Sequence, residues 1–174
     1  MKTPPNRSRK VIVLALSCLF ASAVLGATVK VKIPHEGWTI SFETPFLESK
    51  SQSQEGARFV FAATAGRFDV LLFVEPPGGP GNTHADCYES LWKKASQNPL
   101  IDKGSVKTSE TIDFVRVTYD VLLKTKGHPT RQKNVNYYFS FNEKWVDIRI
   151  SMTSPTAADE KVFAAFDRSL RYGM

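Results

Sequence analysis

Cysteine is scarce in this 174-residue sequence, with one residue at position 18 and one at position 87. Because Cys18 lies in a segment that we expect to be removed, no intramolecular disulfide is predicted for the mature domain. The zinc-hydrolase pattern His-Glu-x-x-His and the serine-hydrolase pattern Gly-x-Ser-x-Gly are absent. The glycines at 78, 79 and 81 are not followed by the Gly-Lys-Ser/Thr of a phosphate-binding loop. We therefore predict no catalytic residue, no metal site and no cofactor.

The first 27 residues have the order of a Sec-type export signal. Basic residues at positions 2, 7, 9 and 10 precede an apolar run over 11–20, and small residues follow. Cleavage after Ala23, Gly26 or Ala27 fits, so we expect a signal peptide over 1–27 and a single domain over 28–174. The run is shorter than the about 20 residues of a transmembrane helix, and apolar residues continue past Cys18, which argues against a lipid anchor there. We expect export to the periplasm of a Gram-negative bacterium.

Little net charge remains once this segment is removed. It holds four of the 23 basic residues and none of the 17 acidic residues, so the mature domain carries a formal net charge of +2. A charge that small predicts no nucleic-acid partner. The basic residues concentrate in a predicted hairpin tip, at Lys124, Lys126, His128, Arg131 and Lys133. We interpret them as contacts for an acidic protein or an anionic cell-envelope partner. A solvated loop without a partner is the alternative.

Hydrophobic periodicity predicts eight strands and two helices. The helices, over 83–98 and 156–170, carry apolar residues three and four positions apart. Thr83 and Asp86 form a capping-box pattern at the start of the first helix. The polar segment 48–56 and the proline- and glycine-rich segment 75–82 are predicted to be loops. The expected strands cover 28–33, 38–42, 58–64, 67–74, 105–111, 114–124, 135–141 and 146–152.

This order of elements predicts an α+β fold, in which helices pack against an antiparallel sheet of hairpins. The strand over 67–74 is apolar on both faces and is therefore placed inside the sheet. The strand over 105–111 is polar and is placed at an edge. No internal repeat or second domain is evident, and we expect a monomer.

The pattern resembles the PsbP-like superfamily, which includes the oxygen-evolving accessory protein of photosystem II and the Ran-binding Mog proteins. The resemblance lies in the opening Pro34-His-Glu-Gly-Trp-Thr-Ile-Ser-Phe-Glu-Thr-Pro45, in the paired hairpins, and in an ending that runs from Trp145 to Phe166-Asp-Arg-Ser-Leu170. It covers nearly all of 34–172. It implies a PsbP-like α/β/α sandwich and a non-catalytic binding or assembly module. Recognition of a macromolecular partner is then expected at the loops 75–83 and 124–133.

Two other functions stay open at this point. One is an immunity or inhibitor protein against a secreted toxin. The other is a hydrolase that uses the polar face of the sheet, with Asp120 and Asp147 as its carboxylates. If their strands are neighbours, Arg116 and Asp120 are instead expected to form a cross-strand ladder of ion pairs with Asp147 and Arg149.

Cys87 falls in the first turn of the first predicted helix, where the amide dipole lowers the pKa of a thiol. It also precedes Leu91 by one helical turn, next to the apolar stripe. We favour packing as a small hydrophobe. A reactive free thiol, or a metal site formed with His84 and Asp86, is the alternative.

Overall fold

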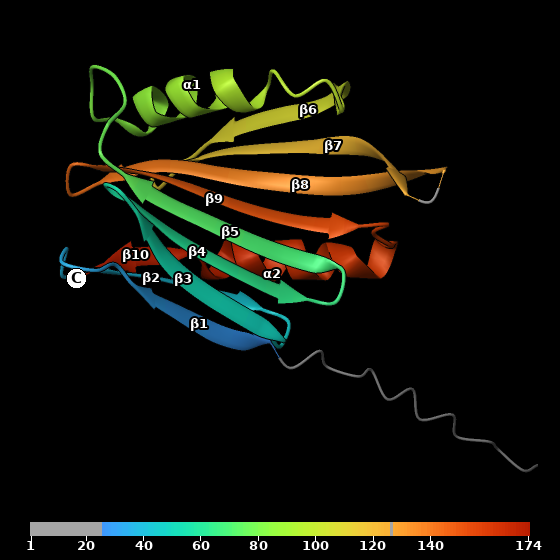
Figure 1. Ribbon diagram of the computed structural model, residues 1–174, viewed down its shortest axis with the longest axis horizontal. Helices are drawn as coiled ribbons and strands as arrows, with labels where there is room; N and C mark the ends of the chain where they lie inside the picture. Colours follow the sequence, from blue (N-terminus) through green and yellow to red (C-terminus); the bar gives the residue numbers. More distant parts are fainter. Residues whose placement is uncertain (1–25, 126) are drawn as a thin grey trace, which may run out of the picture.

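The computed structural model describes residues 26–125 and 127–174 (Figure 1). These residues form an antiparallel seven-stranded sheet, ordered β3-β4-β5-β9-β8-β7-β6, and a three-stranded sheet, ordered β1-β2-β10. Most of the predicted signal peptide lies outside the described residues. Within them, no helix has the length and apolar character needed to cross a membrane. The elements are β1 (Ala27–Lys32), β2 (Thr39–Thr44), β3 (Ser49–Glu55), β4 (Arg58–Ala65), β5 (Phe68–Glu75), α1 (His84–Ala95), β6 (Ile101–Glu110), β7 (Val115–Thr125), β8 (His128–Phe141), β9 (Lys144–Thr153), the 3-10 turn η1 (Ala157–Asp159), α2 (Glu160–Ser169) and β10 (Arg171–Gly173).

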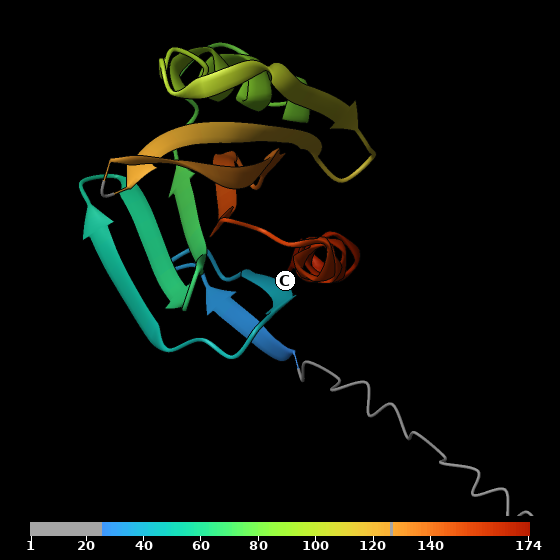
Figure 2. The same cartoon turned by 90° about the vertical axis from the view of Figure 1, so that its right-hand side faces the viewer.

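Different elements cover the two faces of the seven-stranded sheet. Helix α1 lies on one face, called the outer face below, and α2 lies with the three-stranded sheet on the other, inner face (Figures 1 and 2). Side chains of β8 alternate between the two layers. Tyr137 and Phe139 belong to the inner core with Phe166 of α2, whereas Tyr138 belongs to an outer cluster with Leu91 of α1. The chain is thus a mixed fold of antiparallel sheets and two helices, as the sequence predicts.

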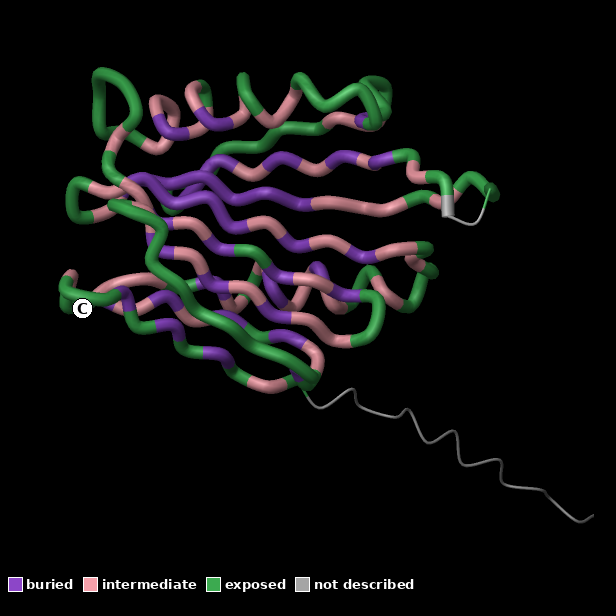
Figure 3. The backbone as a smooth tube through the Cα atoms, in the orientation of Figure 1, coloured by how far each residue is buried: buried purple, intermediate pink, exposed green. Residues whose placement is uncertain are grey.

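The polar segment 48–56, predicted to be a loop, is the strand β3. It pairs with β4 in unbroken register, from Ser49 opposite Thr64 to Glu55 opposite Arg58. All its side chains are exposed (Figure 3), because β3 lies at the sheet edge and is held by backbone pairing with a single neighbour. Such a strand has no apolar face, so hydrophobic alternation does not reveal it. The short β10 was also not predicted.

Two placements made from the sequence are confirmed. β5 lies inside the sheet, between β4 and β9, and β6 lies at an edge. β6 starts earlier than expected, at Ile101, and its register with β7 shifts between Asp102 and Lys107. Such an irregularity hinders pairing of an edge strand with another chain.

Helix α1 begins with the capping box that the sequence predicts. The hydroxyl of Thr83 accepts a hydrogen bond from the backbone N–H of Asp86 (3.1 Å), whose carboxylate accepts one from the N–H of Thr83 (2.9 Å). The preceding loop is fastened to β8, because the N–H of Ser140 donates to Nδ1 of His84 (3.0 Å) and its side chain bonds that of Asn82. The proline- and glycine-rich segment is therefore a loop anchored at its end next to α1.

Helix α2 is bound to the inner face by aromatic stacking and by a polar link. Phe166 stacks on Phe42 and on Tyr137, with ring centroids 4.7 and 5.2 Å apart. The carboxylate of the next residue, Asp167, accepts hydrogen bonds from Nε of Arg116 (2.9 Å) and from the Tyr137 hydroxyl. Together these contacts connect α2 to the small sheet and to the centre of the large one.

The variant Phe166→Ala is expected to lower the free energy of unfolding by about 3–5 kcal/mol, because it leaves a cavity where a fully buried ring packs against two others. Urea denaturation followed by tryptophan fluorescence measures this change. Ile112→Ala is the matched control, since the side chain of Ile112 is 92% exposed, and it should alter stability by less than about 0.5 kcal/mol. Equal effects of the two variants would contradict this packing.

Candidate functional site

A cleft opens on the outer face between the C-terminal half of α1 and strands β4, β5 and β9. Its volume is about 250 Å³. We call it the α1 cleft and define it by five charged side chains and one aromatic side chain that line it: Arg58, Phe73, Glu75, Lys94, Asp147 and Arg149. Sites for drug-sized ligands usually start at about 300 Å³. The α1 cleft therefore has room for a small molecule or a single side chain.

Strand register explains why these residues meet. Phe73 of β5 lies opposite Asp147 of β9, and Leu71 lies opposite Arg149. Residues two positions apart in a strand point to the same face, so this group points to the outer face. Lys94 reaches the cleft from α1, which packs on β7, β8 and β9.

The most buried charge in the cleft is Asp147, with 3% of its side chain exposed. One of its carboxylate oxygens accepts two hydrogen bonds from Arg149, at 2.8 Å from Nε and 2.5 Å from Nη2. The other oxygen accepts a longer bond from Nδ2 of Asn136 (3.4 Å). Burial raises the pKa of Asp147 above its ordinary value, and the charge of Arg149 opposes that rise. The pair holds the guanidinium of Arg149 in one place.

A buried polar network continues below this pair. Asn136, which is fully buried, donates to the hydroxyl of Tyr138 (2.8 Å) and accepts from the hydroxyl of Tyr119 (3.2 Å). Burial raises the pKa of both tyrosines, so their hydroxyls stay protonated at neutral pH. These groups satisfy one another's hydrogen bonds under α1 and support Asp147 from beneath.

Phe73 has guanidinium groups near its ring from two strands. The carbon Cζ of Arg58 lies 5.2 Å from the ring centroid, and that of Arg149 lies 5.1 Å from it. Arg58 is also paired with Glu55 at 2.6 Å. A guanidinium at this distance from a ring is attracted to its face. Both guanidinium groups thus have a defined position beside the half-buried ring of Phe73, which forms the floor of the cleft.

Lys94 and Glu75 differ from the other charged groups of the cleft. Neither makes an ion pair with another residue in the described part of the chain. Lys94 comes from the helix and Glu75 from the end of β5, so opposite charges are supplied by opposite walls. The cleft therefore offers one cation and one anion that lack an ion-pair partner.

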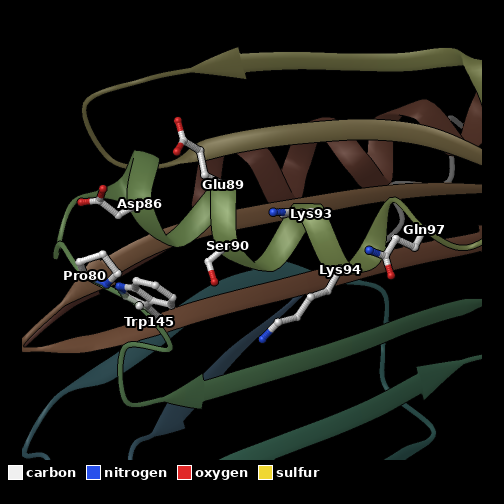
Figure 4. A pocket seen from close by; sticks show the side chains of 9 residues that line it. Pro80, Asp86, Glu89, Ser90, Lys93, Lys94, Gln97 and Trp145 are labelled. Atoms are coloured by element: carbon white, nitrogen blue, oxygen red, sulfur yellow. The ribbon is translucent and has the colours of Figure 1, made fainter.

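A second, more open hollow of about 530 Å³ runs along α1, between the helix, the loop before it and Trp145. We call it the α1 groove. In Figure 4, Lys94 and Ser90 point from the helix toward the open part of the sheet, and the Trp145 ring lies below the start of the helix. Lys94 is shared with the α1 cleft. The groove is lined by Pro80, Asp86, Ser90, Lys93, Gln97 and Trp145, with Gly79, Glu89 and Lys94.

The groove contains a spacing that the sequence analysis missed. Ser90-Leu-Trp-Lys93 matches the Ser-x-x-Lys pattern of some serine acyl-transfer enzymes. In the described residues, no hydrogen bond joins the Ser90 hydroxyl to Lys93 or Lys94, and in Figure 4 the side chains of Ser90 and Lys93 point apart. A serine nucleophile needs a base within hydrogen-bond reach. The prediction of no catalytic residue therefore overlooked a motif, but the motif is not assembled as a reactive pair.

The predicted hairpin tip divides into two groups. Lys124 and His128 are exposed, whereas Lys126 lies outside the described residues. Arg131 is paired with Asp120 (2.8 Å), and Lys133 is paired with Glu160 of α2 (2.6 Å) and lies over an aromatic ring of the same helix. Arg131 and Lys133 thus take part in internal contacts that a partner would have to compete with.

The tip and the loop 75–83 lie at opposite ends of the sheet (Figure 1). His128 begins β8, and Ser140, near its other end, contacts the start of α1. Twelve residues of extended strand span about 40 Å. The two loops therefore form two surfaces, and a partner that touches both has to extend along the whole sheet.

The expected cross-strand ladder was wrong. β8 lies between β7 and β9, so Arg116 and Asp120 are not adjacent to Asp147 and Arg149. They also point to different faces: Asp120 lies in register with Lys133 and, through it, with Met152 of the inner core, whereas Asp147 points outward. Arg116 pairs with Asp167, Asp120 pairs with Arg131, and Asp147 pairs with Arg149. Asp120 and Asp147 consequently share no cleft, which removes the carboxylate pair named for a hydrolase.

Cys87 is fully buried and unpaired. Its thiol donates to the carbonyl of Val146 (3.5 Å), and burial raises its pKa to about 12. Desolvation in the outer cluster thus outweighs the helix dipole, as the packing interpretation expects. The neighbours proposed for a metal site have other partners, since His84 accepts from Ser140 and Asp86 bonds Thr83. Within the described residues, no three His, Cys, Asp or Glu side chains gather to hold a metal ion.

Comparison with known proteins gives little support for any assignment. No family model and no curated protein matches the chain. Among solved structures it is similar to a crystal structure from Bacteroides thetaiotaomicron VPI-5482, with a TM-score of 0.41 and 13% identity, over 78% of this chain and 45% of that chain. The chain thus spans less than half the length of that protein. A likeness of this extent supports no conclusion about function.

Thiol labelling tests the state of Cys87. At about pH 8 the native protein should react far more slowly than the urea-unfolded chain, since the thiol is buried and protonated. Because its pKa rises from 9.0 to about 12 on folding, the free energy of unfolding should fall between these pH values. This fall should be shallower in Cys87→Ala. Rapid stoichiometric labelling of the native protein would contradict the burial of the thiol.

The variant Asp147→Ala should lower the free energy of unfolding by about 1–3 kcal/mol, because it leaves Arg149 and Asn136 without their buried acceptor. Glu55→Ala is the matched control. It removes the exposed partner of Arg58 and should cost about 0–1 kcal/mol. Urea denaturation of both variants gives the comparison, and a smaller effect at Asp147 than at Glu55 would rule out a stabilising pair.

Proposed function

We propose that this chain is an exported, non-catalytic binding module of the bacterial cell envelope that recognises a protein partner through the α1 groove and the loop 75–83. The observation that carries the proposal is the anchoring of this loop. Ser140 of β8 donates hydrogen bonds to His84 and Asn82 and so fixes the end of the loop. The Trp145 ring lies so close to Gly79 that a Cβ atom added there would contact it at 3.6 Å. A loop fixed beside a helix offers a surface that needs little ordering on binding.

The arrangement of charges also favours recognition over chemistry. Asp147, Arg149 and Arg58 are engaged in ion pairs. Among the described residues, no hydrogen bond joins the Ser90 hydroxyl to Lys93 or Lys94, and in Figure 4 the side chains of Ser90 and Lys93 point apart. The lysines that line the α1 groove, Lys93 and Lys94, provide specificity for a charged partner, whereas acyl transfer needs a nucleophile and a base in contact.

We also propose membership of the PsbP-like superfamily as a three-layered α/β/α sandwich. What supports it is the placing of the residues that resemble the family. Trp38 and Phe42 are buried at β2, and Trp145 is the second residue of β9. Phe166 of α2 and Leu170, directly after it, pack in the inner core. The motifs thus occupy positions that the core needs. The exported location rests on the order of residues in the segment 1–27.

A second surface, the hairpin tip, belongs to the same proposal as an independent contact. Lys124 and His128 are its exposed members in the described part of the chain. An acidic partner held there would bind more weakly at high salt. Because the tip lies about 40 Å from the start of α1 along β8, variants at the tip and at the loop 75–83 test separate contacts.

Capture from envelope extracts tests the function. The full chain, expressed with its leader and a C-terminal tag in a Gram-negative host, should appear in the periplasmic fraction with a new amino terminus between positions 24 and 28. Cross-linking to extract from the organism that encodes it should yield a partner. Lys93→Glu should reduce that capture at least tenfold by reversing a charge of the groove, whereas Lys161→Glu, an exposed lysine of α2, should retain it.

Each outcome has a defined meaning. Equal capture by Lys93→Glu and Lys161→Glu contradicts the groove, and loss in Lys124→Glu alone moves the contact to the hairpin tip. An uncut chain that stays in the cytoplasm contradicts export. Capture of a secreted toxin that the chain inhibits favours the immunity function. Turnover of a substrate that is lost in Ser90→Ala favours an enzyme.

A further inference from the structure

The geometry points to a binding site for a small zwitterion in the α1 cleft: an α-amino acid with an apolar side chain, held by Lys94 and Glu75 over Phe73. This site adjoins the surface proposed for a protein partner and shares Lys94 with it, but it takes a different kind of ligand. Three observations support it: the charges of the cleft, its apolar floor and its volume.

The charges left without partners in the cleft have opposite signs. Asp147 is neutralised by Arg149, and Arg58 is paired outside the cleft with Glu55. Lys94 and Glu75 make no ion pair with any described residue, nor with each other. A ligand with one carboxylate and one ammonium group satisfies both. A simple anion meets repulsion from Glu75, and a simple cation meets repulsion from Lys94.

The floor of the cleft suits an apolar side chain. The half-buried ring of Phe73 has a guanidinium near it from Arg58 and another from Arg149. Leu91 and Ala95 of α1 supply apolar surface on the opposite wall. An aliphatic or aromatic side chain placed here covers surface that water otherwise contacts. Arg149 also lines the cleft, and its N–H groups that do not bond Asp147 are further donors for a carboxylate.

The volume of the cleft limits the ligand. About 250 Å³ accommodates a single amino acid and is below the usual range for larger ligands. The walls come from strands and a helix, and Asp147, Arg149 and Arg58 are held by ion pairs. Lys94 and Glu75 are thus the groups whose positions change on binding, and they adjust on an otherwise fixed frame.

Calorimetric titration of the full chain with leucine and two truncated analogues tests the site. L-Leucine should bind with a dissociation constant on the order of 1 mM or lower. 4-Methylpentanoate lacks the ammonium group and isopentylamine lacks the carboxylate, so each should bind at least tenfold more weakly. Phenylalanine should bind comparably to leucine.

Two variants test which residue binds which charged group of the ligand. In Glu75→Gln, 4-methylpentanoate should bind as well as leucine, since the group that recognises the ammonium is gone. In Lys94→Gln, isopentylamine should bind as well as leucine. The controls Glu110→Gln and Lys161→Gln change exposed groups away from the cleft and should keep the tenfold preferences of the unmodified chain. Because the readout is a ratio of affinities, a loss of folded protein does not imitate it.

Three results would overturn the inference: no heat for leucine at concentrations well above 1 mM, equal affinity of leucine and both analogues for the unmodified chain, or unchanged preferences in Glu75→Gln and Lys94→Gln. None of these outcomes depends on whether envelope extracts yield a protein partner. Conversely, a failure to capture a partner leaves the titration unaffected, so the two proposals fail separately.

Discussion

The burial of β8 and β9 on both faces is the constraint on which the rest of the structure depends. From Val135 to Ser140 every residue of β8 is buried, so neither alternate set of side chains reaches water. An apolar residue meets this demand by packing, but Asn136 has to find hydrogen bonds within the protein. It obtains them from Tyr119, Tyr138 and Asp147. The polar network under α1 therefore results from the burial of the central strands on both faces of the sheet.

The cover on the outer face is incomplete, and this creates the cleft. A helix is about 10–12 Å wide and neighbouring strands are about 4.8 Å apart, so one helix covers about two to three strands of a wider sheet. Helix α1 packs on the β7–β9 side, and the outer surface of β4 and β5 stays open. Leu71 is 38% exposed there. The charged residues of the α1 cleft stand at the border between the covered and the open part of this face.

Sequence patterns revealed the buried part of the fold and missed what lies at edges. Both helices follow from periodicity, because burial imposes a regular spacing of apolar residues. The interior position of β5 follows from its two apolar faces, and the capping box follows from the local pattern of Thr83 and Asp86. β3 has no buried residue, so its sequence shows no regular spacing of apolar residues. The α1 cleft was missed for a related reason. Its residues come from β4, β5, α1 and β9, and only strand register brings Phe73 beside Asp147.

The same register determines which charges are fixed and which are adaptable. Asp147 lies where the cover by α1 ends, so its carboxylate is buried while the side chain of Arg149 remains 40% exposed. A buried carboxylate requires a close partner, and this requirement fixes the guanidinium at the border, near Phe73. Lys94 and Glu75 lie just outside that border, where water stabilises a charge without a partner. The place where the cover by α1 ends thus explains both why Lys94 and Glu75 are adaptable side chains and why Arg149 is fixed. A ligand in the α1 cleft replaces water around Lys94 and Glu75 and leaves the buried pair unchanged, so its selectivity is set by these two residues.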